Sequence, residues 1–177
     1  MENSPEEEVY HGSHQEFDSD HATPRRNVRT RTNEQGVEVV TFDQESFHAT
    51  PHKWIALAYT YHTAPYEIDG KIAHYGMGVD LYQDPDAKTV VILGFGSLEE
   101  SLQKMYGEGG YVYHFGKDRF IYKEGLGNLE VITTEPTKPV VAEKISNPVE
   151  EMKKLGVNFE FIDLGLPENE AQRNYTD

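Results

Sequence analysis

The feature that most restricts the fold is a series of short runs rich in aromatic and β-branched residues. Such residues fit the pleated, half-buried surface of a sheet, and the runs have the usual length of strands. The chain is therefore expected to consist mainly of strands. The predicted strands are residues 37–42, 46–50, 76–82, 89–95, 110–115, 119–122, 129–134, 140–145 and 159–164.

Three segments predict helices because each has a start signal. The first begins at Pro51 with Thr50 as its cap, the second follows Ser97, and the third follows Asn147. Helices this few and this irregularly placed do not form βαβ repeats. The predicted fold class is therefore α+β, with a mixed, mostly antiparallel sheet.

The domain boundaries follow from composition. Residues 1–7 and 165–177 are polar and lack apolar periodicity, so both are predicted to be disordered tails around one domain at residues 8–164. Residues 14–36 are rich in turn formers and carry four arginines, which predicts a long mobile loop. Residues 61–75 are aromatic but aperiodic, and a second long loop is expected there.

The formal charge of -15 disfavours non-specific binding to nucleic acid, because a phosphate backbone would be repelled. It equally disfavours a dinucleotide. A site for one must therefore supply its own donors from backbone N–H groups, arginine or histidine.

The sequence has no cysteine, which excludes disulfides and thiolate metal ligands. His11, His14 and His21 have no matching ligand pair elsewhere, so no metal site is expected. The start of the chain resembles no signal peptide, and no apolar run is long enough to span a membrane. A cytoplasmic protein or a secreted effector is expected, without a membrane partner.

Three segments carry residues suited to one binding site. A predicted strand contains Tyr10-His11-Gly12-Ser13, where the imidazole can donate to a ribose hydroxyl and the glycine backbone can pair with a carboxamide. This pattern alone is more typical of an ordinary turn. The second segment, Phe47-His48-Ala49-Thr50, leads into the helix that bears Tyr59. The ring of Tyr59 can stack on a flat heterocycle, or Tyr59 can simply lie half-exposed beside an apolar helix face.

The third segment places Glu130 within the apolar run 129–134, on the same strand face as Ile132. A carboxylate there lies at a solvated edge, or it stabilises positive charge. Cleavage of the bond between nicotinamide and ribose develops such charge on the ribose.

In this order, the three segments resemble the His-Tyr-Glu class of ADP-ribosyltransferases, which includes diphtheria-type toxins and poly(ADP-ribose) polymerases. That class has Tyr-His-Gly on a first strand, an aromatic-small-Ser/Thr strand end before a helix whose tyrosine lies eleven residues on, and a glutamate in a motif like Val-Glu-Tyr-Ile. The counterparts here are Tyr10-His11-Gly12, Phe47-His48-Ala49-Thr50 with Tyr59, and Leu129-Glu130-Val131-Ile132.

The resemblance implies a split-sheet fold and NAD as substrate. It implies that His11 binds the ribose, that Gly12 binds the carboxamide, that Tyr59 stacks on nicotinamide and that Glu130 is the catalytic carboxylate. The rest of the predicted NAD site consists of Ser13, His48 and Thr50. ADP-ribose would pass to an unknown protein or nucleic-acid acceptor, or to water, as in a toxin or effector.

Two residues depart from the family pattern. His48 stands where the family usually has a second aromatic residue, so an imidazole, or Phe47 instead, would face Tyr59 across the nicotinamide. Asn128 replaces the acidic or amide residue of the arginine-modifying class, which makes arginine an unfavoured acceptor.

Three alternatives stay open. The chain can be a non-catalytic module that binds NAD or ADP-ribose, or an acidic protein that covers a basic partner. The third concerns the cluster Arg25, Arg26, Arg29 and Arg31, which can be a solvated loop or can fold over the site to bind the pyrophosphate of NAD.

Overall fold

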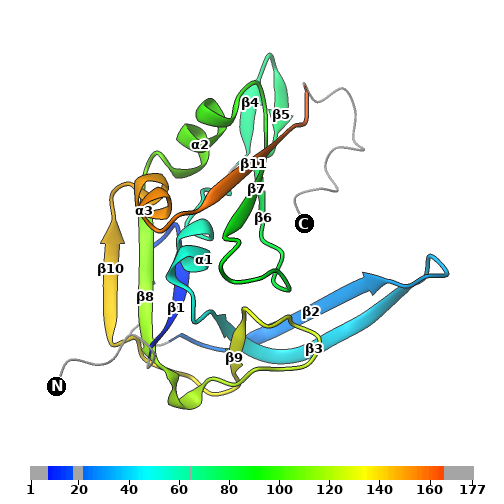
Figure 1. The fold of residues 1–177 in the computed structure, drawn as a ribbon, viewed down its shortest axis with the longest axis vertical. Helices are drawn as coiled ribbons and strands as arrows, with labels where there is room; N and C mark the ends of the chain where they lie inside the picture. Colours follow the sequence, from blue (N-terminus) through cyan, green and yellow to red (C-terminus); the bar gives the residue numbers. More distant parts are fainter. Residues whose placement is uncertain (1–7, 18–21, 64, 166–177) are drawn as a thin grey trace.

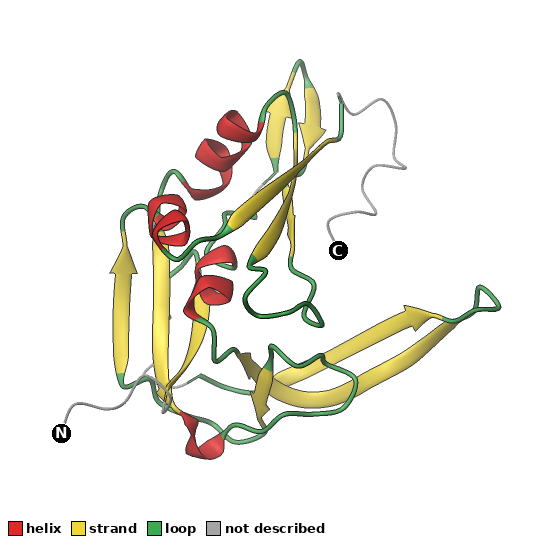
Figure 2. Cartoon of the chain, viewed as in Figure 1, coloured by secondary structure: helices red, strands yellow, loops and turns green. Residues whose placement is uncertain are grey.

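The fold is a body of small sheets and helices from which one long hairpin projects (Figure 1). The structure is a computed structural model that describes residues 8–17, 22–63 and 65–165. The described elements confirm the α+β class, with mostly antiparallel strands and few helices (Figure 2). They are β1 Glu8–Ser13, β2 Arg25–Thr32, β3 Glu38–Ala49, α1 Lys53–Ala58, β4 Tyr66–Ile68, β5 Lys71–Ala73, β6 Gly76–Gly78, β7 Thr89–Gly94, α2 Leu98–Tyr106, β8 Gly110–Gly116, a 3₁₀ turn at Lys117–Arg119, β9 Val131–Thr133, β10 Val141–Ile145, α3 Pro148–Lys154 and β11 Asn158–Asp163.

The body has two sheets. In the first, β8 lies between β1 and β10 and is antiparallel to both. In the second, β7 lies between β6 and β11, antiparallel to β6 and parallel to β11. Helix α1 packs in the main core with residues of both sheets, and its residues Trp54 to Ala58 are all buried. A short helix that is apolar on every side is stable only when other elements surround it, as they do here.

The hairpin of β2 and β3, called the arm below, extends away from this body (Figure 1). The root of β3 pairs with β9, with Phe47 opposite Thr133. Phe47 also packs in a second core with Phe115 and Phe120, so aromatic contacts fasten the root of the arm to the β1–β8 sheet.

The prediction of a mobile loop at residues 14–36 is wrong for its second half. Arg25–Thr32 forms β2, which pairs with β3 along its whole length. The sequence shows many turn formers there and little hydrophobicity. The backbone hydrogen bonds of β2 come from β3, a partner that the local composition cannot reveal.

Several strands have different bounds in the structure from those predicted. Residues 37–42 and 46–50 belong to one continuous strand, β3, whereas 76–82 is a strand only over Gly76–Gly78. Residues 119–122 form no strand, although Ile121 bridges to Ile132. The expected loop at 61–75 contains the β4–β5 hairpin, whose Asp69-Gly70 turn has a positive φ at both residues, as a two-residue hairpin turn requires.

The helix start signals have mixed outcomes. Ser97 and Asn147 cap α2 and α3 as predicted, each accepting a hydrogen bond from the backbone N–H three residues on. Helix α1 does not begin at Pro51 under a Thr50 cap. Its N-cap is His52, without a side-chain cap bond. The Thr50 hydroxyl donates to the Leu129 carbonyl just before β9 and accepts from the His52 N–H.

The predictions for residues 1–7 and 166–177 lie outside the described residues, as does His21. Gly165, assigned to the second tail, is described, and its N–H donates to Asp163. No helix in the described part of the chain is long and apolar enough to cross a membrane.

Candidate functional site

One cavity of about 630 Å³ lies where the body meets the root of the arm. It is lined by residues of β1, α1, β2 and the end of β3, and by Leu129 and Glu130 just before β9. Every residue of the predicted site lines this cavity: His11, Gly12, Ser13, His48, Thr50, Tyr59 and Glu130. Segments more than a hundred residues apart in sequence thus share one site.

Thr50 joins the three segments. Its backbone N–H donates to Tyr10 and its carbonyl accepts from Tyr10, at 2.9 and 2.7 Å, which fastens the end of β3 to β1. Its buried hydroxyl donates to the Leu129 carbonyl at 2.7 Å, which fixes the residue before Glu130. Thr50 therefore sets the spacing of the site rather than capping a helix.

Close packing is the first reason that residue 12 must be a glycine. A Cβ built on Gly12 would lie 1.7 Å from the Ala56 carbonyl oxygen, so β1 and α1 touch backbone to backbone there. Tyr10 turns its N–H and C=O away from β8 and towards Thr50. Backbone groups alternate along a strand, so Gly12 turns its own N–H and C=O to the same edge, where a carboxamide can pair with them.

His11 is neutral at physiological pH. Burial lowers its pKa, outweighing the hydrogen bond with the His48 carbonyl, which raises it, while the nearby His48 ring lowers it further. Its Nδ1–H donates to that carbonyl at 2.8 Å, so Nε2 carries the lone pair. The imidazole would accept a hydrogen bond from a ribose hydroxyl rather than donate one.

Tyr59 forms the C-terminal cap of α1 and lines the cavity, and 43% of the residue is exposed. It lies beside the buried residues Trp54–Ala58 of the helix, an arrangement that fits both the stacking role and a half-exposed residue next to an apolar helix face. Desolvation and the Glu130 carboxylate raise the pKa of its hydroxyl, so the phenol stays protonated at neutral pH. An accessible, neutral aromatic ring is the feature that a flat heterocycle needs for stacking.

Glu130 is the buried carboxylate of the site, with only 8% of the residue exposed. Its Oε1 accepts from Arg29 at 2.8 Å and from His48 Nδ1 at 2.6 Å. Its Oε2 is buried and has no hydrogen-bond partner among the described residues. An unsatisfied buried carboxylate oxygen is costly, and it marks a place where a ligand can supply the missing donor.

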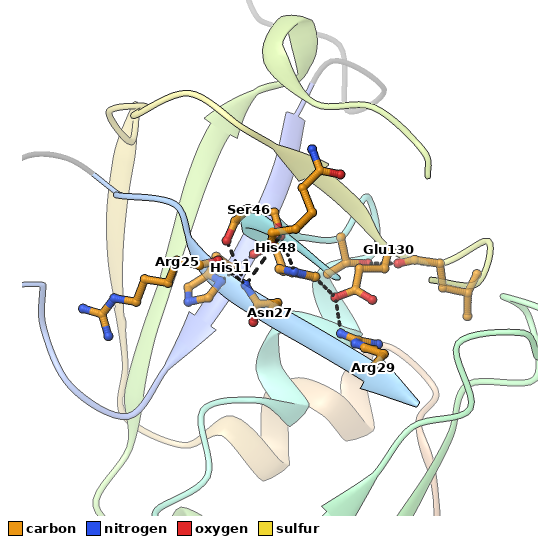
Figure 3. A network of polar contacts seen from close by, with 10 residues as sticks. His11, Arg25, Asn27, Arg29, Ser46, His48 and Glu130 are labelled. Carbon is orange, nitrogen blue, oxygen red and sulfur yellow. Dashed lines mark hydrogen bonds and ion pairs between the residues drawn. The ribbon is translucent and has the colours of Figure 1, made fainter. Parts of the chain in front are cut away.

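Both ring nitrogens of His48 have polar partners. Nδ1 contacts Glu130, and Nε2 lies 2.9 Å from Ser46 Oγ. Residues 46 and 48 project from the same side of β3, as alternate strand residues do. The residue that departs from the family pattern thus connects Ser46 to the candidate catalytic carboxylate (Figure 3).

Strand β2 contributes residues that the predicted site omits. Arg25, Asn27 and Arg29 alternate along β2 and all line the cavity. Arg25 points away from Glu130 (Figure 3) and makes no side-chain hydrogen bond or ion pair with a described residue. Arg26, on the other side of β2, pairs with Asp43 instead. The cluster of arginines in this segment was the sequence signal both for the arginines that line the cavity and for the one that pairs outside it.

Comparisons with known proteins give no match. No protein-family model, curated protein or solved structure matches this chain. Within the described ranges, no three His, Asp or Glu side chains are grouped to hold a metal ion. The chemistry of the cavity itself is therefore the basis for a functional proposal.

Proposed function

We propose that this chain binds NAD in the cavity, cleaves its bond between nicotinamide and ribose, and transfers ADP-ribose to a macromolecule or to water. The observation that carries the proposal is the buried, unpartnered Oε2 of Glu130 beside the accessible ring of Tyr59. A ribose 2-hydroxyl would supply the missing donor. The ionised carboxylate would then stabilise the positive charge that develops on the ribose as nicotinamide leaves.

The other residues fit the same ligand. The free edge of Gly12 suits the carboxamide, Tyr59 suits the pyridinium ring, and neutral His11 suits a ribose hydroxyl. Arg25, which pairs with no described side chain, offers a cation to the pyrophosphate, which offsets the repulsion expected from a chain of charge -15. Each group is of the polarity that the matching part of NAD requires.

The test is Glu130→Gln, assayed by nicotinamide release and by calorimetric titration with NAD. Gln keeps the size of the side chain but removes the negative charge. Release should fall on the order of 100-fold or more while NAD binding persists, because the charge acts mainly on the transition state. Glu135→Gln, at an exposed carboxylate paired with Arg119, is the matched control and should keep full release. Normal release by Glu130→Gln would rule out the assigned role.

A second candidate is a module that binds NAD or ADP-ribose without cleaving it. The observation that favours it is that Oε1 of Glu130 is already occupied by Arg29 and His48, which restrains the carboxylate. This candidate predicts a calorimetric binding signal with NAD and no nicotinamide release by the unaltered protein. Release above the spontaneous rate would exclude it.

A further inference from the structure

Ser46, His48 and Glu130 form a continuous hydrogen-bonded chain along one side of the cavity. Ser46 Oγ lies 2.9 Å from His48 Nε2, and His48 Nδ1 lies 2.6 Å from Glu130 Oε1. Both distances are within ordinary hydrogen-bond length. A hydroxyl, an imidazole and a carboxylate in this order is the arrangement that activates a serine as a nucleophile.

The direction of each hydrogen bond follows from the carboxylate. Ionised Glu130 can only accept, so His48 Nδ1 must carry the proton and donate it. In a neutral ring, Nε2 then has the lone pair, and the Ser46 hydroxyl donates to it. The other acceptor near Ser46 Oγ is the Gln44 carbonyl, at 3.5 Å, which is too long to compete with the imidazole.

Ser46 faces the site rather than the exterior. The residue is only 2% exposed, yet it lines the cavity together with Tyr59 and Glu130. The width of one imidazole ring and two hydrogen bonds separates its hydroxyl from the carboxylate. A ribose whose 2-hydroxyl donates to Glu130 Oε2 would occupy the cavity that Ser46 also lines.

We propose that Ser46 is an internal acceptor for ADP-ribose, so that the chain modifies itself within its own site. This inference rests on the proposed function, because it needs NAD as donor. The bond between the anomeric carbon and the nicotinamide nitrogen breaks, and its electron pair leaves with neutral nicotinamide. A bond forms between that carbon and Ser46 Oγ, while the hydroxyl proton passes to His48 Nε2 and then to solvent.

The carboxylate serves both parts of this step. It stabilises the positive ribose through Oε2, and through Oε1 it stabilises the imidazolium that forms when His48 takes the proton. The acceptor is thereby defined as a hydroxyl held on β3 rather than a carboxylate or a guanidinium. Self-modification would also fill the cavity and limit each chain to a single adduct.

The experiment incubates the purified chain with NAD and no other protein. Nicotinamide release, intact mass and peptide mapping are read from the same samples. We expect one ADP-ribose per chain on the peptide that contains Ser46. Hydroxylamine should leave this adduct in place, because it cleaves ADP-ribose from carboxylates but not from a serine oxygen. An adduct that hydroxylamine removes would contradict the proposal.

Four variants sharpen the result. Ser46→Ala should lose the adduct, Ser46→Thr should retain part of it through its hydroxyl, and His48→Gln should slow its formation at least tenfold. Ser146→Ala, at an exposed serine outside the cavity, should be modified like the unaltered chain. Ser46→Thr and His48→Gln decide the question if Ser46→Ala fails to fold.

The failures of the two proposals are distinguishable. Nicotinamide release without an adduct at Ser46, or an equal adduct on Ser46→Ala, would overturn the internal acceptor and leave NAD cleavage intact. No nicotinamide release by the unaltered chain would overturn both.

Discussion

The two walls of the cavity are built in different ways. On the body side, β1 and α1 meet backbone to backbone at Gly12 and Ala56, and α1 is buried on every face. On the arm side, β2 is an edge strand whose side chains are largely exposed and polar. One wall is fixed by packing, whereas the other is held by hydrogen bonds and ion pairs.

Because of this difference, changes in the body wall are expected to affect the stability of the fold, and changes in the arm wall the affinity for the ligand. Changes in the body wall should alter the free energy of unfolding, because close-packed interiors tolerate little change in volume. Changes in the arm wall should alter ligand binding with little effect on folding, because exposed ion pairs contribute little to stability. The two walls meet at Thr50, which bonds to both β1 and the segment before β9.

The largest effect is expected for Gly12→Ala. The new methyl would lie 1.7 Å from the Ala56 carbonyl oxygen, so β1 and α1 must separate. We expect the free energy of unfolding to fall by about 3 kcal/mol or more, at the upper end for overpacked cores. Gly116→Ala, at the end of β8 with open space around the new methyl, is the control and should change it by less than about 1 kcal/mol. Similar values for both in urea unfolding would show that the β1–α1 wall is loose.

Thr50→Val comes second. Valine keeps the shape of threonine but removes the hydroxyl that donates to Leu129, and the carbonyl of Leu129 then lacks this bond. We expect a loss of about 1–3 kcal/mol in the free energy of unfolding, together with weaker NAD binding because Glu130 shifts. Thr60→Val removes a buried hydroxyl that bonds Leu57 away from the cavity. It should cost similar stability without weakening NAD binding, and equal Kd values for the two variants would contradict a positioning role for Thr50.

The same contrast explains how much the sequence could predict. The body-side residues His11, Gly12 and Tyr59 stand in short motifs whose spacing is fixed by one strand and one helix, so local patterns were enough to nominate them. β2 is a strand only because β3 pairs with it, and its turn-rich composition pointed to a loop. Thr50 was predicted as a site residue and lines the cavity, but its predicted role as a helix cap is wrong, because its hydroxyl donates to a segment seventy-nine residues away.

The contacts of His48 were harder to predict from the sequence than the role of Thr50. Its position in the motif indicated a stacking residue, whereas its two ring nitrogens contact Ser46 and Glu130. The first of these contacts could have been suspected from the spacing of two along a strand. The second depends on how β9 docks against the root of β3, which requires the tertiary fold.

Arg25→Glu and Arg26→Glu form the third test, directed at the arm wall. Arg25 lines the cavity and pairs with no other side chain in the described part of the protein, whereas Arg26 pairs with Asp43 outside the cavity. Reversing the charge at residue 25 should weaken NAD binding by about tenfold, the effect of one charged hydrogen bond to the pyrophosphate. Arg26→Glu should leave the NAD Kd nearly unchanged, although its net charge change is the same. Equal weakening in calorimetric titrations would mean that overall charge, not the face of β2, governs affinity.

The smallest effect is a gradual one, and it concerns His11 on the body wall. Burial depresses the pKa of His11 below its ordinary value of 6.5, so in acid the unfolded chain binds a proton that the folded chain refuses. The free energy of unfolding should therefore fall as the pH drops below 6.5, with a slope of at most about 1.4 kcal/mol per pH unit from this residue. The slope should end once the pH passes below the depressed pKa. Urea unfolding of the unaltered chain and of His11→Gln isolates this contribution, because the other titrating groups are common to both. A slope as steep in His11→Gln would show that burial in the body wall does not depress the pKa of His11.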